Sequence, residues 1–478
     1  MISLAAFSHS PDRRARMSLI DHKDSRPIHF MGIAGAGMSA LAELCVRRGA
    51  TVTGCDHAAD QAGDLERLGI QVRHGHDASH LGGHRALVVS SAIPKDHPEI
   101  VRARALGIAV VRRAEALAEA TAGGQRLVAV AGTHGKSTTT VMVTEALKGA
   151  GIDATGVVGA RVRAWGGNLS QGADQVFAVE ADEYDRSFLA LDPQVAVVTN
   201  IEADHLDIYK DLDDIRDTFA TFSARSRWLV ICADDRWANL LPSPATAEVM
   251  RYGIESPDAR LVARNVTAVD GGSAFDVAFD GKPMGHVVLS VPGTHNVLNA
   301  LAAIAVGVGS WGASVELLAR GLANFRGVER RFERLGDARG VSVIDDYAHH
   351  PTEIRATLAA ARLAYPGRRI IAAFQPHLFS RTKDFAAEFA DALCAADETW
   401  LADIYPAREQ PMRGVTSALI ADQMADAGKA PAWRGPRAEL ASNLKASVTT
   451  GDVVITIGAG DITRTGPELL SLLRQGTA

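Results

Sequence analysis

The chain has 478 residues, of which 47% are hydrophobic and 22% charged, and its formal net charge is −6. This length predicts about three domains of roughly 100–200 residues, and the acidic balance argues against a nucleic acid partner held by bulk electrostatics. No apolar run reaches the ~18 residues of a membrane-spanning helix, and no signal peptide pattern is present. The four cysteines are scattered and include no C-x-x-C pair, which favours a reducing cytoplasm over disulfides or a cysteine zinc site.

Apolar strands alternate with helical stretches along the chain, which predicts an α/β protein with mostly parallel sheets. A small, polar, glycine-containing stretch at 119–127 marks one boundary, and a second boundary lies near residues 323–336. Between residues 256 and 293, alternating apolar residues and turn signals predict a β-rich insertion with antiparallel hairpins. Residues 1–25 are expected to form a disordered extension, in which Met17 is a second possible start. The expected domains cover residues 26–121, 122–324 and 325–478.

The first domain opens with a glycine turn. The strand "IHFM" leads into "GIAGAGMSA", in which Gly35, Gly37 and Ala40 fit the G-x-G-x-x-G/A fingerprint. Asp56 ends the next strand, 21 residues after Gly35, as in a Rossmann unit. Such a turn holds phosphates at a helix N-terminus and a ribose hydroxyl at the acid. The pattern alone fits either a nicotinamide dinucleotide or another nucleotide with a pyrophosphate.

A second phosphate loop follows at residues 128–147, "VAVAGTHGKSTTTVMVTEAL", which reads as strand, glycine loop and helix. Its glycines, Lys136 and Ser137 resemble a P-loop, although only two residues separate Gly132 from Gly135. The glycines let backbone N–H groups approach phosphate, the lysine serves the β- and γ-phosphates, and the hydroxyl serves Mg²⁺. The alternative is that Gly-Lys-Ser only caps a helix, but three threonines are poor choices for helix propensity alone.

Six polar loops directly follow predicted strands. Ligands bind outside the carboxyl ends of strands in open α/β sheets. A single loop of this kind could contain polar residues by chance. Six such loops predict a site that is assembled from two or more domains. The loops are "THGKS", "ADEYD", "IEADH", "YAHHP", "HLFSRT" and "DITR".

The loop "AGTHGKSTTT" closely resembles the ATP-binding loop of the Mur ligase family, the amide-forming enzymes of peptidoglycan precursor synthesis. The resemblance extends over nearly the whole chain from residue 26, and within the family it is greatest to the branch that uses L-alanine. The motifs that carry it, in chain order, are "GIAGAGMSALAEL", "VVSSAIPKDHPE", "EADEYDRSFL", "TNIEADHLDIY", "HNVLNALAA", "GVERRFE", "DDYAHHPTEIRATL" and "FQPHLFSRT".

The resemblance implies three domains: a Rossmann-like N-terminal domain, a central P-loop ATPase-like domain that contains the β-rich insertion, and a Rossmann-like C-terminal domain. It also implies a reaction. With Mg²⁺, ATP phosphorylates the lactyl carboxylate of UDP-N-acetylmuramate, and the L-alanine amine displaces phosphate from the acyl phosphate. The oligomeric state is not implied.

The resemblance further implies the roles of individual residues. For Mg²⁺ it implies Ser137, Glu180 and His205. For catalysis it implies Lys136, Glu180, His205, Asp346 and His349, with His350 as a weaker match. For ATP it implies Gly132, Thr133, His134, Gly135, Lys136, Ser137, Thr138, His295, Asn296 and Arg331.

Each of these assignments has a plainer alternative. A lone histidine after a strand, such as His205, is often structural, and Asn296 could cap a helix. Arg330 and Arg331 could be an exposed basic pair. The acids Asp182, Glu183 and Asp185 are either close partners of the site or solvated. Several Mur ligases carry a carbamylated lysine beyond the histidine, but here only Lys210 occurs, too early in the chain, so the support of a second metal stays open.

The two remaining substrates are assigned on the same ground. For the UDP-sugar the resemblance implies Gly32, Gly35, Gly37, Asp56 and Ser91. For the carboxylate of L-alanine it implies Arg381, whose planar guanidinium can form two parallel hydrogen bonds. Some relatives have a second arginine where this chain has Leu378. The alternative is a surface arginine close to Lys383 and Asp384.

Three other functions are alternatives to an L-alanine-adding ligase. A recycling ligase that adds an intact tripeptide to the same UDP-sugar shares the first half of the pattern, but "DDYAHHPTE" and "QPHLFSRT" favour the alanine enzyme. A Rossmann oxidoreductase explains residues 28–56 and leaves the second phosphate loop without a role. A non-catalytic nucleotide-binding regulator is disfavoured because Lys136, Ser137, Glu180 and His205 are all present.

Overall fold

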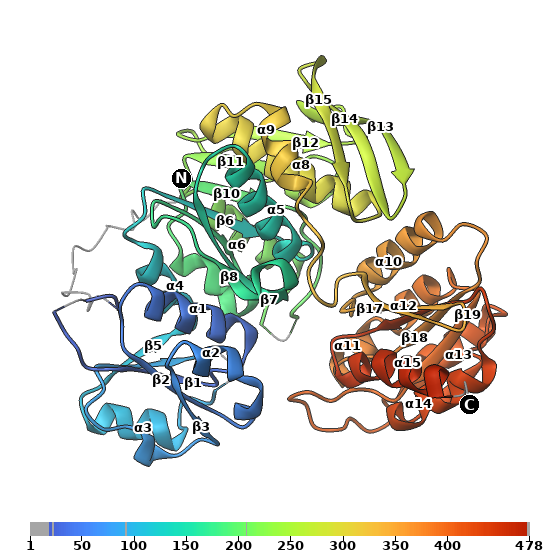
Figure 1. Cartoon of the computed structure of the whole chain (residues 1–478), viewed down its shortest axis with the longest axis horizontal. Coiled ribbons are helices and arrows are strands. Elements are labelled where there is room, and N and C mark those ends of the chain that lie inside the picture. The colour runs from blue at the N-terminus through green and yellow to red at the C-terminus, as the bar shows by residue number, and fades with distance from the viewer. Residues whose placement is uncertain (1–18, 22, 91–92, 207, 476–478) are drawn as a thin grey trace, which may run out of the picture. The chain divides into compact units, whose positions relative to one another are not determined.

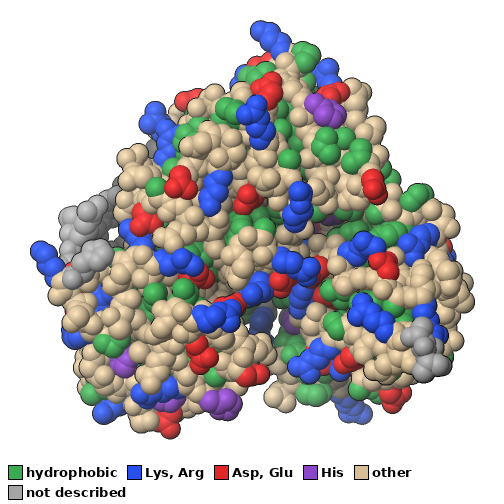
Figure 2. Space-filling model, in the orientation of Figure 1, with side chains coloured by type: hydrophobic (Ala, Val, Ile, Leu, Met, Phe, Trp, Pro, Cys, Tyr) green, Lys and Arg blue, Asp and Glu red, His purple; other side chains and the backbone are tan. Residues whose placement is uncertain are grey.

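The computed structural model describes residues 19–21, 23–90, 93–206 and 208–475 (Figure 1). The chain divides into two compact units, Met1–Gly123 and Gly124–Ala478, which are taken in turn. Each sheet is assembled from strand–helix repeats, as the alternation of apolar strands and helical stretches predicts. Among the described residues, no helix combines the length and the apolar character that crossing a bilayer requires. On the face seen in Figure 2, basic and acidic side chains are interspersed.

The first unit contains a five-stranded parallel sheet in the order β3-β2-β1-β4-β5, which is the Rossmann order 3-2-1-4-5-6 without its sixth strand. Ile28 of β1 pairs with Val52 of β2 and with Ala86 of β4. The elements are β1 (Ile28–Met31), α1 (Ala36–Arg47), β2 (Val52–Asp56), α2 (Gly63–Arg67), β3 (Gln71–His74), β4 (Ala86–Val89), α3 (Pro98–Ala105), β5 (Ala109–Arg112) and α4 (Arg113–Thr121).

The N-terminal extension expected at residues 1–25 lies mostly outside the described residues, which begin at Leu19. The side chain of Leu19 is buried, with 1% of its residue surface exposed. Its carbonyl oxygen accepts a 2.6 Å hydrogen bond from the guanidinium of Arg85, which is buried as well. The packed part of the first unit therefore begins no later than Leu19.

The second unit contains two sheets, and the first is ten-stranded in the order β15-β14-β13-β12-β11-β10-β6-β9-β7-β8. Strands β13 to β15 pair antiparallel, as expected of the insertion, and β7 pairs antiparallel with β8. The elements are β6 (Arg126–Ala131), α5 (Lys136–Gly149), β7 (Ala154–Val162), β8 (Gly167–Ser170), β9 (Val176–Glu180), β10 (Val195–Val198), α6 (Leu212–Ser223), β11 (Trp228–Cys232), α7 (Arg236–Asn239), β12 (Glu248–Gly253), β13 (Leu261–Val269), β14 (Gly272–Phe279), β15 (Lys282–Leu289), α8 (Thr294–Trp311) and α9 (Val315–Leu322).

Helix α5 carries the phosphate loop at its N-terminus and is held in place by close packing. A Cβ atom on Gly149 would come within 2.3 Å of the Gly321 nitrogen, and one on Gly321 within 1.9 Å of the Glu145 carbonyl oxygen. Helices α5 and α9 can therefore approach this closely only because both positions are glycine. The apolar face of α8 completes this core with a run of buried residues from Ala300 to Val306.

The second sheet of this unit is six-stranded in the order β16-β17-β21-β18-β19-β20, and its strands are parallel except for β16. With the two preceding sheets it confirms the predicted three-domain α/β architecture. The elements are β16 (Glu333–Ala338), β17 (Val341–Asp346), α10 (Pro351–Ala364), β18 (Ile370–Phe374), α11 (Phe379–Asp384), α12 (Ala386–Leu393), β19 (Glu398–Ala402), α13 (Ala418–Asp426), β20 (Trp433–Gly435), α14 (Arg437–Ser447), β21 (Val453–Ile457) and α15 (Thr465–Gln475).

Candidate active site

The phosphate loop joins β6 to α5 and requires glycine at two positions. Gly132 has φ +140° and Gly135 has φ +82°, so both adopt backbone conformations that side chains disfavour. A Cβ on Gly132 would lie 1.9 Å from the Thr199 Oγ1, and one on Gly135 2.7 Å from the Asn299 Oδ1. Gly135 is the N-cap of α5, and no side chain caps it in the described structure. The first-turn N–H groups of α5 are therefore free of a side-chain cap in the described structure and can face an anion.

Lys136 reaches back over this loop. Its Nζ donates hydrogen bonds to the carbonyl oxygens of Gly132 at 2.7 Å and Thr133 at 3.2 Å, and to the Glu183 Oε1 at 3.0 Å. Burial raises the pKa of Glu183 to about 7, although Lys136 opposes the shift. Burial alone would lower the pKa of Lys136, but Glu183 and Asp182 raise it above its usual value. Glu183 is thus a buried counter-ion of the lysine rather than a solvated acid.

Ser137 and Glu180 meet next to the lysine. Glu180 ends β9, and burial raises the pKa of its carboxyl, although the neighbouring Ser137 hydroxyl opposes the shift. The Glu180 Oε1 is buried without a hydrogen-bond partner in the described structure. A carboxylate oxygen without a partner beside a hydroxyl suits a hard cation that prefers oxygen ligands. These two side chains therefore fit a Mg²⁺ ion.

His205 lies beside the lysine–glutamate pair. It has φ +54°, and its Nε2 is 3.7 Å from the Glu183 Oε1 and 3.8 Å from the Asp204 Oδ2. Burial lowers its pKa, so the imidazole is held in the neutral form that metal binding requires. Lys210 is exposed, with its Nζ 3.8 Å from the Asp211 Oδ2, and lies away from this group. The acids next to His205 are therefore Glu183 and Asp204.

A cavity of about 280 Å³ opens beside the phosphate loop and is lined from both sheets of the second unit. Burial lowers the pKa of His295 to about 4, which keeps this lining residue neutral. Asn296 donates a 2.7 Å hydrogen bond to the Pro292 carbonyl oxygen, and Gly293 is the N-cap of α8. The capping alternative for Asn296 is therefore wrong. The predicted residues that line the cavity are His134, Gly135, Ser137, Thr138, His295, Asn296, Arg331 and Asp346.

The two consecutive arginines differ in their surroundings. Arg330 donates to the Asp345 Oδ2 at 3.1 Å and to the Gly458 carbonyl oxygen at 2.6 Å, which ties it into the C-terminal sheet. Arg331 lines the cavity, and its Nη1 donates to the Glu353 Oε1 at 3.3 Å. Of the pair, Arg331 is the residue that lines the cavity.

Asp346 ends β17 and His349 follows it, at the carboxyl ends of the strands of the C-terminal sheet. Asp346 accepts backbone hydrogen bonds from Phe332 at 2.8 Å and Ala348 at 2.7 Å, and burial raises its pKa to about 6. His349 turns to α10, where its Nδ1 is 3.2 Å from the Glu353 Oε2. Only Asp346 lines the cavity, whereas His349 joins a network beside it.

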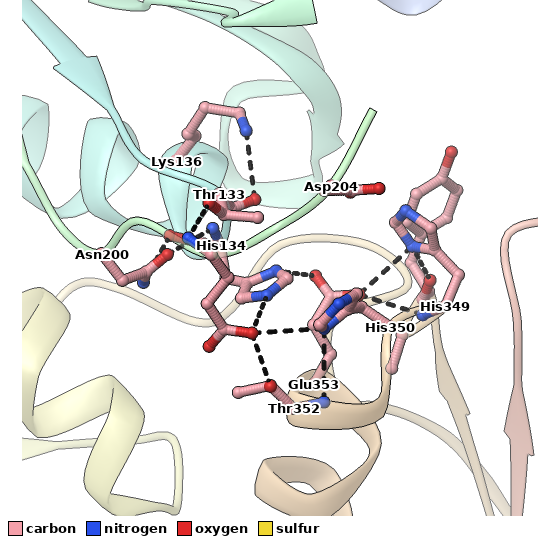
Figure 3. A network of polar contacts seen from close by, with 12 residues as sticks. Thr133, His134, Lys136, Asn200, Asp204, His349, His350, Thr352 and Glu353 are labelled. Atoms are coloured by element: carbon pink, nitrogen blue, oxygen red, sulfur yellow. Dashed lines mark hydrogen bonds and ion pairs between the residues drawn. The ribbon is translucent and has the colours of Figure 1, made fainter. Parts of the chain in front are cut away.

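This network links the two sheets of the second unit through His134 (Figure 3). The His134 Nδ1 is 3.3 Å from the Glu353 Oε1, and its Nε2 is 3.6 Å from the Glu202 Oε2. Burial alone would lower the pKa of His134, but the two glutamates raise it to about 9. The Thr352 hydroxyl donates to the Glu202 Oε2 at 2.7 Å, and the His350 Nδ1 is 3.5 Å from it. The imidazolium of His134 is therefore held between acids from both sheets.

Sequence reasoning did not single out Glu202, Glu353 or Asp204, although each lies inside a quoted motif. Glu353 follows Pro351 in the first turn of α10, where an acid is common for reasons of helix stability alone. Asp204 accepts a 2.6 Å hydrogen bond from the Arg381 Nη2, and both side chains are more than nine-tenths buried. Arg381 is thus no surface residue.

In the first unit, the glycine turn has the geometry of an anion site. Gly32 has φ +78°, and Gly35 is the N-cap of α1 without a side-chain cap in the described structure. Asp56 accepts hydrogen bonds from the backbone nitrogens of Ala34 and Ala58, both at 2.9 Å, so it braces the turn. A Cβ on Gly37 would lie 3.0 Å from the Arg113 Nη1. The expected contact at Ser91 lies outside the described residues.

The fold and the cavity together define a three-domain α/β protein with a phosphate loop that faces its C-terminal domain. Family models match each domain in turn: "Mur ligase family, catalytic domain" over residues 27–125, "Mur ligase middle domain" over 130–307 and "Mur ligase, glutamate ligase domain" over 330–460. The chain belongs to the Mur ligase family, whose members are ATP-dependent.

Individual relatives are similar over nearly their whole length. The chain is 46% identical to a UDP-N-acetylmuramate–L-alanine ligase of Paenarthrobacter aurescens over 93% of this chain and 97% of that protein. It is 45% identical to the ligase of the same name from Cutibacterium acnes over 96% and 98%. Among solved structures, UDP-N-acetylmuramate-alanine ligase from Thermotoga maritima matches with a TM-score of 0.81 at 30% identity over 94% and 100%. A murein peptide ligase from Psychrobacter arcticus matches with a TM-score of 0.70 at 26% identity over 95% and 100%.

Proposed function

We propose that this chain is an ATP-dependent ligase that joins L-alanine to the lactyl carboxylate of UDP-N-acetylmuramate. The observation that carries the proposal is its identity of 46% and 45%, over more than nine-tenths of the chain, to two ligases of that name. The recycling ligase is the weaker candidate, because the murein peptide ligase structure matches at lower identity and TM-score than the alanine ligase structure.

We assign the cavity to ATP, with its phosphates over the loop from Gly132 to Ser137. Mg²⁺ would be held by Ser137 and Glu180, and when bound it neutralises charge on the phosphates. Lys136 is held by Glu183 at 3.0 Å and can exchange this partner for a phosphate oxygen. Because Glu183 has a raised pKa, it can take up a proton once the lysine has turned to phosphate. Glu183 also adjoins His205, and we propose it as the acid that supports this histidine in place of a modified lysine.

The reaction proceeds in two displacements. A lactyl carboxylate oxygen attacks the γ-phosphorus of ATP, the bond to the ADP oxygen breaks, and an acyl phosphate forms. The L-alanine nitrogen then attacks the acyl carbon, inorganic phosphate leaves, and the nitrogen loses a proton as the amide forms. Both steps depend on positioning and charge neutralisation rather than on a covalent enzyme intermediate.

We assign the carboxylate of L-alanine to Arg381, which lies in α11, the short helix after β18. Its present partner Asp204 is a carboxylate of the same chemistry, so the substrate would compete for the guanidinium. Asp204 is a charged group even at low pH, because Arg381 outweighs the effect of burial and holds the pKa of Asp204 well below its usual range. We assign the glycine turn and Asp56 of the first unit to the diphosphate and ribose of the UDP-sugar. A cytoplasmic location fits four free cysteines.

The test is ADP release with UDP-N-acetylmuramate and Mg-ATP across a panel of amino donors, with the product identified by mass spectrometry. We expect L-alanine to give the fastest ADP release and a UDP-N-acetylmuramoyl-alanine product. Faster release with the tripeptide than with L-alanine would favour the recycling ligase instead. ATP binding without any ADP release, whichever donor is supplied, would favour a non-catalytic nucleotide-binding protein.

A further inference from the structure

The first unit contains a buried cluster of metal-ligating side chains that no step of the proposed reaction uses. His29 lies in β1, Cys55 in β2, His80 in the short 3-10 helix η2 (Ala78–His80) and Glu99 in α3. One ligand atom from each residue lies within 4.8 Å of all the others. Three of the four residues are fully buried, and the His80 side chain is 10% exposed. A thiol, two imidazoles and a carboxylate thus converge inside the domain.

Three of the distances between ligand atoms match those of a tetrahedral site. The Cys55 Sγ is 3.4 Å from the His29 Nε2 and 3.5 Å from the Glu99 Oε1. The Glu99 Oε1 is 3.3 Å from the His80 Nδ1. Around zinc, with bonds of about 2.1 Å to nitrogen or oxygen and about 2.3 Å to sulfur, tetrahedral ligand atoms lie about 3.3–3.6 Å apart. Three of the six edges of the tetrahedron therefore already have this length.

A second observation comes from His80. Its Nδ1 is buried and has no hydrogen-bond partner in the described part of the chain, although a carboxylate oxygen lies 3.3 Å away. A buried ring nitrogen without a hydrogen bond is unfavourable, and native structures rarely leave one. The nitrogen and the carboxylate oxygen instead converge on a common point that a cation could occupy.

The surroundings of the cluster hold its members in orientation. The other ring nitrogen of His29, Nδ1, is 2.8 Å from the Thr53 Oγ1, and the Glu99 Oε1 accepts a 2.7 Å hydrogen bond from the Asp77 backbone nitrogen. Histidines that bind metals commonly have their second nitrogen held in this way.

We propose that His29, Cys55, His80 and Glu99 form a structural zinc site. Sulfur, nitrogen and oxygen donors in tetrahedral array suit Zn²⁺, and four protein ligands leave no open position for catalysis. On binding, the S–H bond of Cys55 breaks, a sulfur–zinc bond forms, and the proton passes to solvent. The sequence has no C-x-x-C pair, which argues against a zinc site built from cysteines. In the proposed site, however, three of the four ligands are not cysteine, and the four ligands come from four separate elements.

Such a site would stabilise the base of the glycine turn. The Cys55 carbonyl oxygen accepts a 2.8 Å hydrogen bond from the Gly32 nitrogen, and the next residue is Asp56, which holds the turn from the other side. Zinc would therefore tie β1, β2 and α3 together directly below the predicted UDP-sugar site. The alternative is a metal-free cluster in which the Cys55 thiol donates to Glu99.

Cobalt substitution tests the site in the full-length chain without a histidine tag. Apoprotein made by chelation would be titrated with CoCl₂ in the absence of Mg²⁺ and nucleotide. We expect one equivalent to give a thiolate-to-cobalt charge-transfer band in the near ultraviolet and visible bands of tetrahedral intensity. Zinc should abolish both by displacement. The lack of a charge-transfer band in the wild-type protein would overturn the proposal, whatever any variant does.

Matched variants assign the ligands. Cys55→Ser should abolish the charge-transfer band and weaken zinc binding more than about 100-fold in competition with a chromophoric chelator. Glu99→Gln, which keeps the side-chain shape, should shift the visible bands and weaken binding. Cys45→Ser in α1 and Cys232→Ser in the ATP cavity are the controls and should leave the spectrum unchanged. A band that survives Cys55→Ser, or disappears in Cys232→Ser, would place the metal elsewhere and refute this site.

Discussion

Arg381 in α11 donates a 2.6 Å hydrogen bond to Asp204, which follows β10, and both side chains are buried. The pair joins the C-terminal sheet to the central sheet across 177 residues of sequence. A buried guanidinium with a single carboxylate partner is poised to exchange it for another carboxylate, because the alternative of an unpaired buried charge is strongly unfavourable. The proposed exchange partner is the carboxylate of L-alanine.

Replacing Arg381 with alanine tests this assignment. A charge-assisted hydrogen bond contributes about 1.5–3 kcal/mol, so Arg381→Ala should raise the KM for L-alanine ~10–150-fold. The KM values for ATP and UDP-N-acetylmuramate should change little. Arg355→Ala, which removes an exposed arginine paired with Asp391 at 2.9 Å, is the matched control and should change none of the three. A parallel rise of all three constants in Arg381→Ala would indicate a structural role only.

Lys136 is expected to neutralise the transferring phosphate. Lys136→Ala should therefore lower turnover roughly 10²–10³-fold while UDP-sugar binding, measured by calorimetry, stays close to wild type. The fold should survive, because Glu183 has a pKa near 7 with the lysine present and can become protonated without it. Lys148→Ala, at the other end of α5, is the control. Turnover within threefold of wild type in Lys136→Ala would contradict the role.

Glu180 is expected to bind the metal through an oxygen that has no other partner. Glu180→Gln replaces this charged donor with an amide and should raise the Mg²⁺ concentration for half-maximal rate about 10–100-fold. Removing Mg²⁺ with EDTA should stop ADP release in both proteins. Glu145→Gln, whose carboxylate instead accepts a 2.7 Å hydrogen bond from Trp165, should keep the wild-type Mg²⁺ dependence. An unchanged Mg²⁺ requirement in Glu180→Gln would remove Glu180 from the metal site.

His134 predicts a pH dependence of stability. Its pKa rises from 6.5 to about 9 on folding, so the charged form stabilises the folded state fully below pH ~6.5, and this contribution is lost as the pH rises through 9. The whole effect is on the order of 3 kcal/mol, at about 1.4 kcal/mol per pH unit between the two pKa values. His134→Gln should thus lower the thermal midpoint more at pH 6 than at pH 9.5, without nucleotide. An equal difference at both pH values, or the same pattern in the exposed control His286→Gln, would refute it.

The N-terminus provides a test by truncation. Residues 1–16 are predicted to be dispensable, so a chain that begins at Met17 should keep the wild-type rate and thermal midpoint. A chain that begins at Ser25 also loses Leu19, whose buried side chain contributes about 2 kcal/mol. It should therefore unfold at a lower temperature. A large loss of rate or stability already at Met17 would show that the first residues contribute to the fold.

Much of the architecture was predictable because it rests on local patterns. Residues close together in the sequence determine the strand–helix alternation, the glycine turns of the two phosphate loops and the hairpins at 256–293. The positive φ angles at Gly132 and Gly135 follow from the choice of glycine at these positions. The position of polar motifs directly after strands also predicted which sheet edges carry the candidate site. Resemblance to a family then supplied chemical roles that local pattern could not.

By itself, the sequence determined the class of fold, the phosphate loop and the residue types available to the site. Only the tertiary structure decided which acid meets which base: Glu183 pairs with Lys136, Asp204 with Arg381, and His80 converges with Cys55 and Glu99. The reason is that strand order and crossover geometry bring together residues that are far apart in the chain. A sequence pattern does not distinguish among acids at similar spacings in the chain. In the folded protein, burial makes one pairing of acid and base much more favourable than the others.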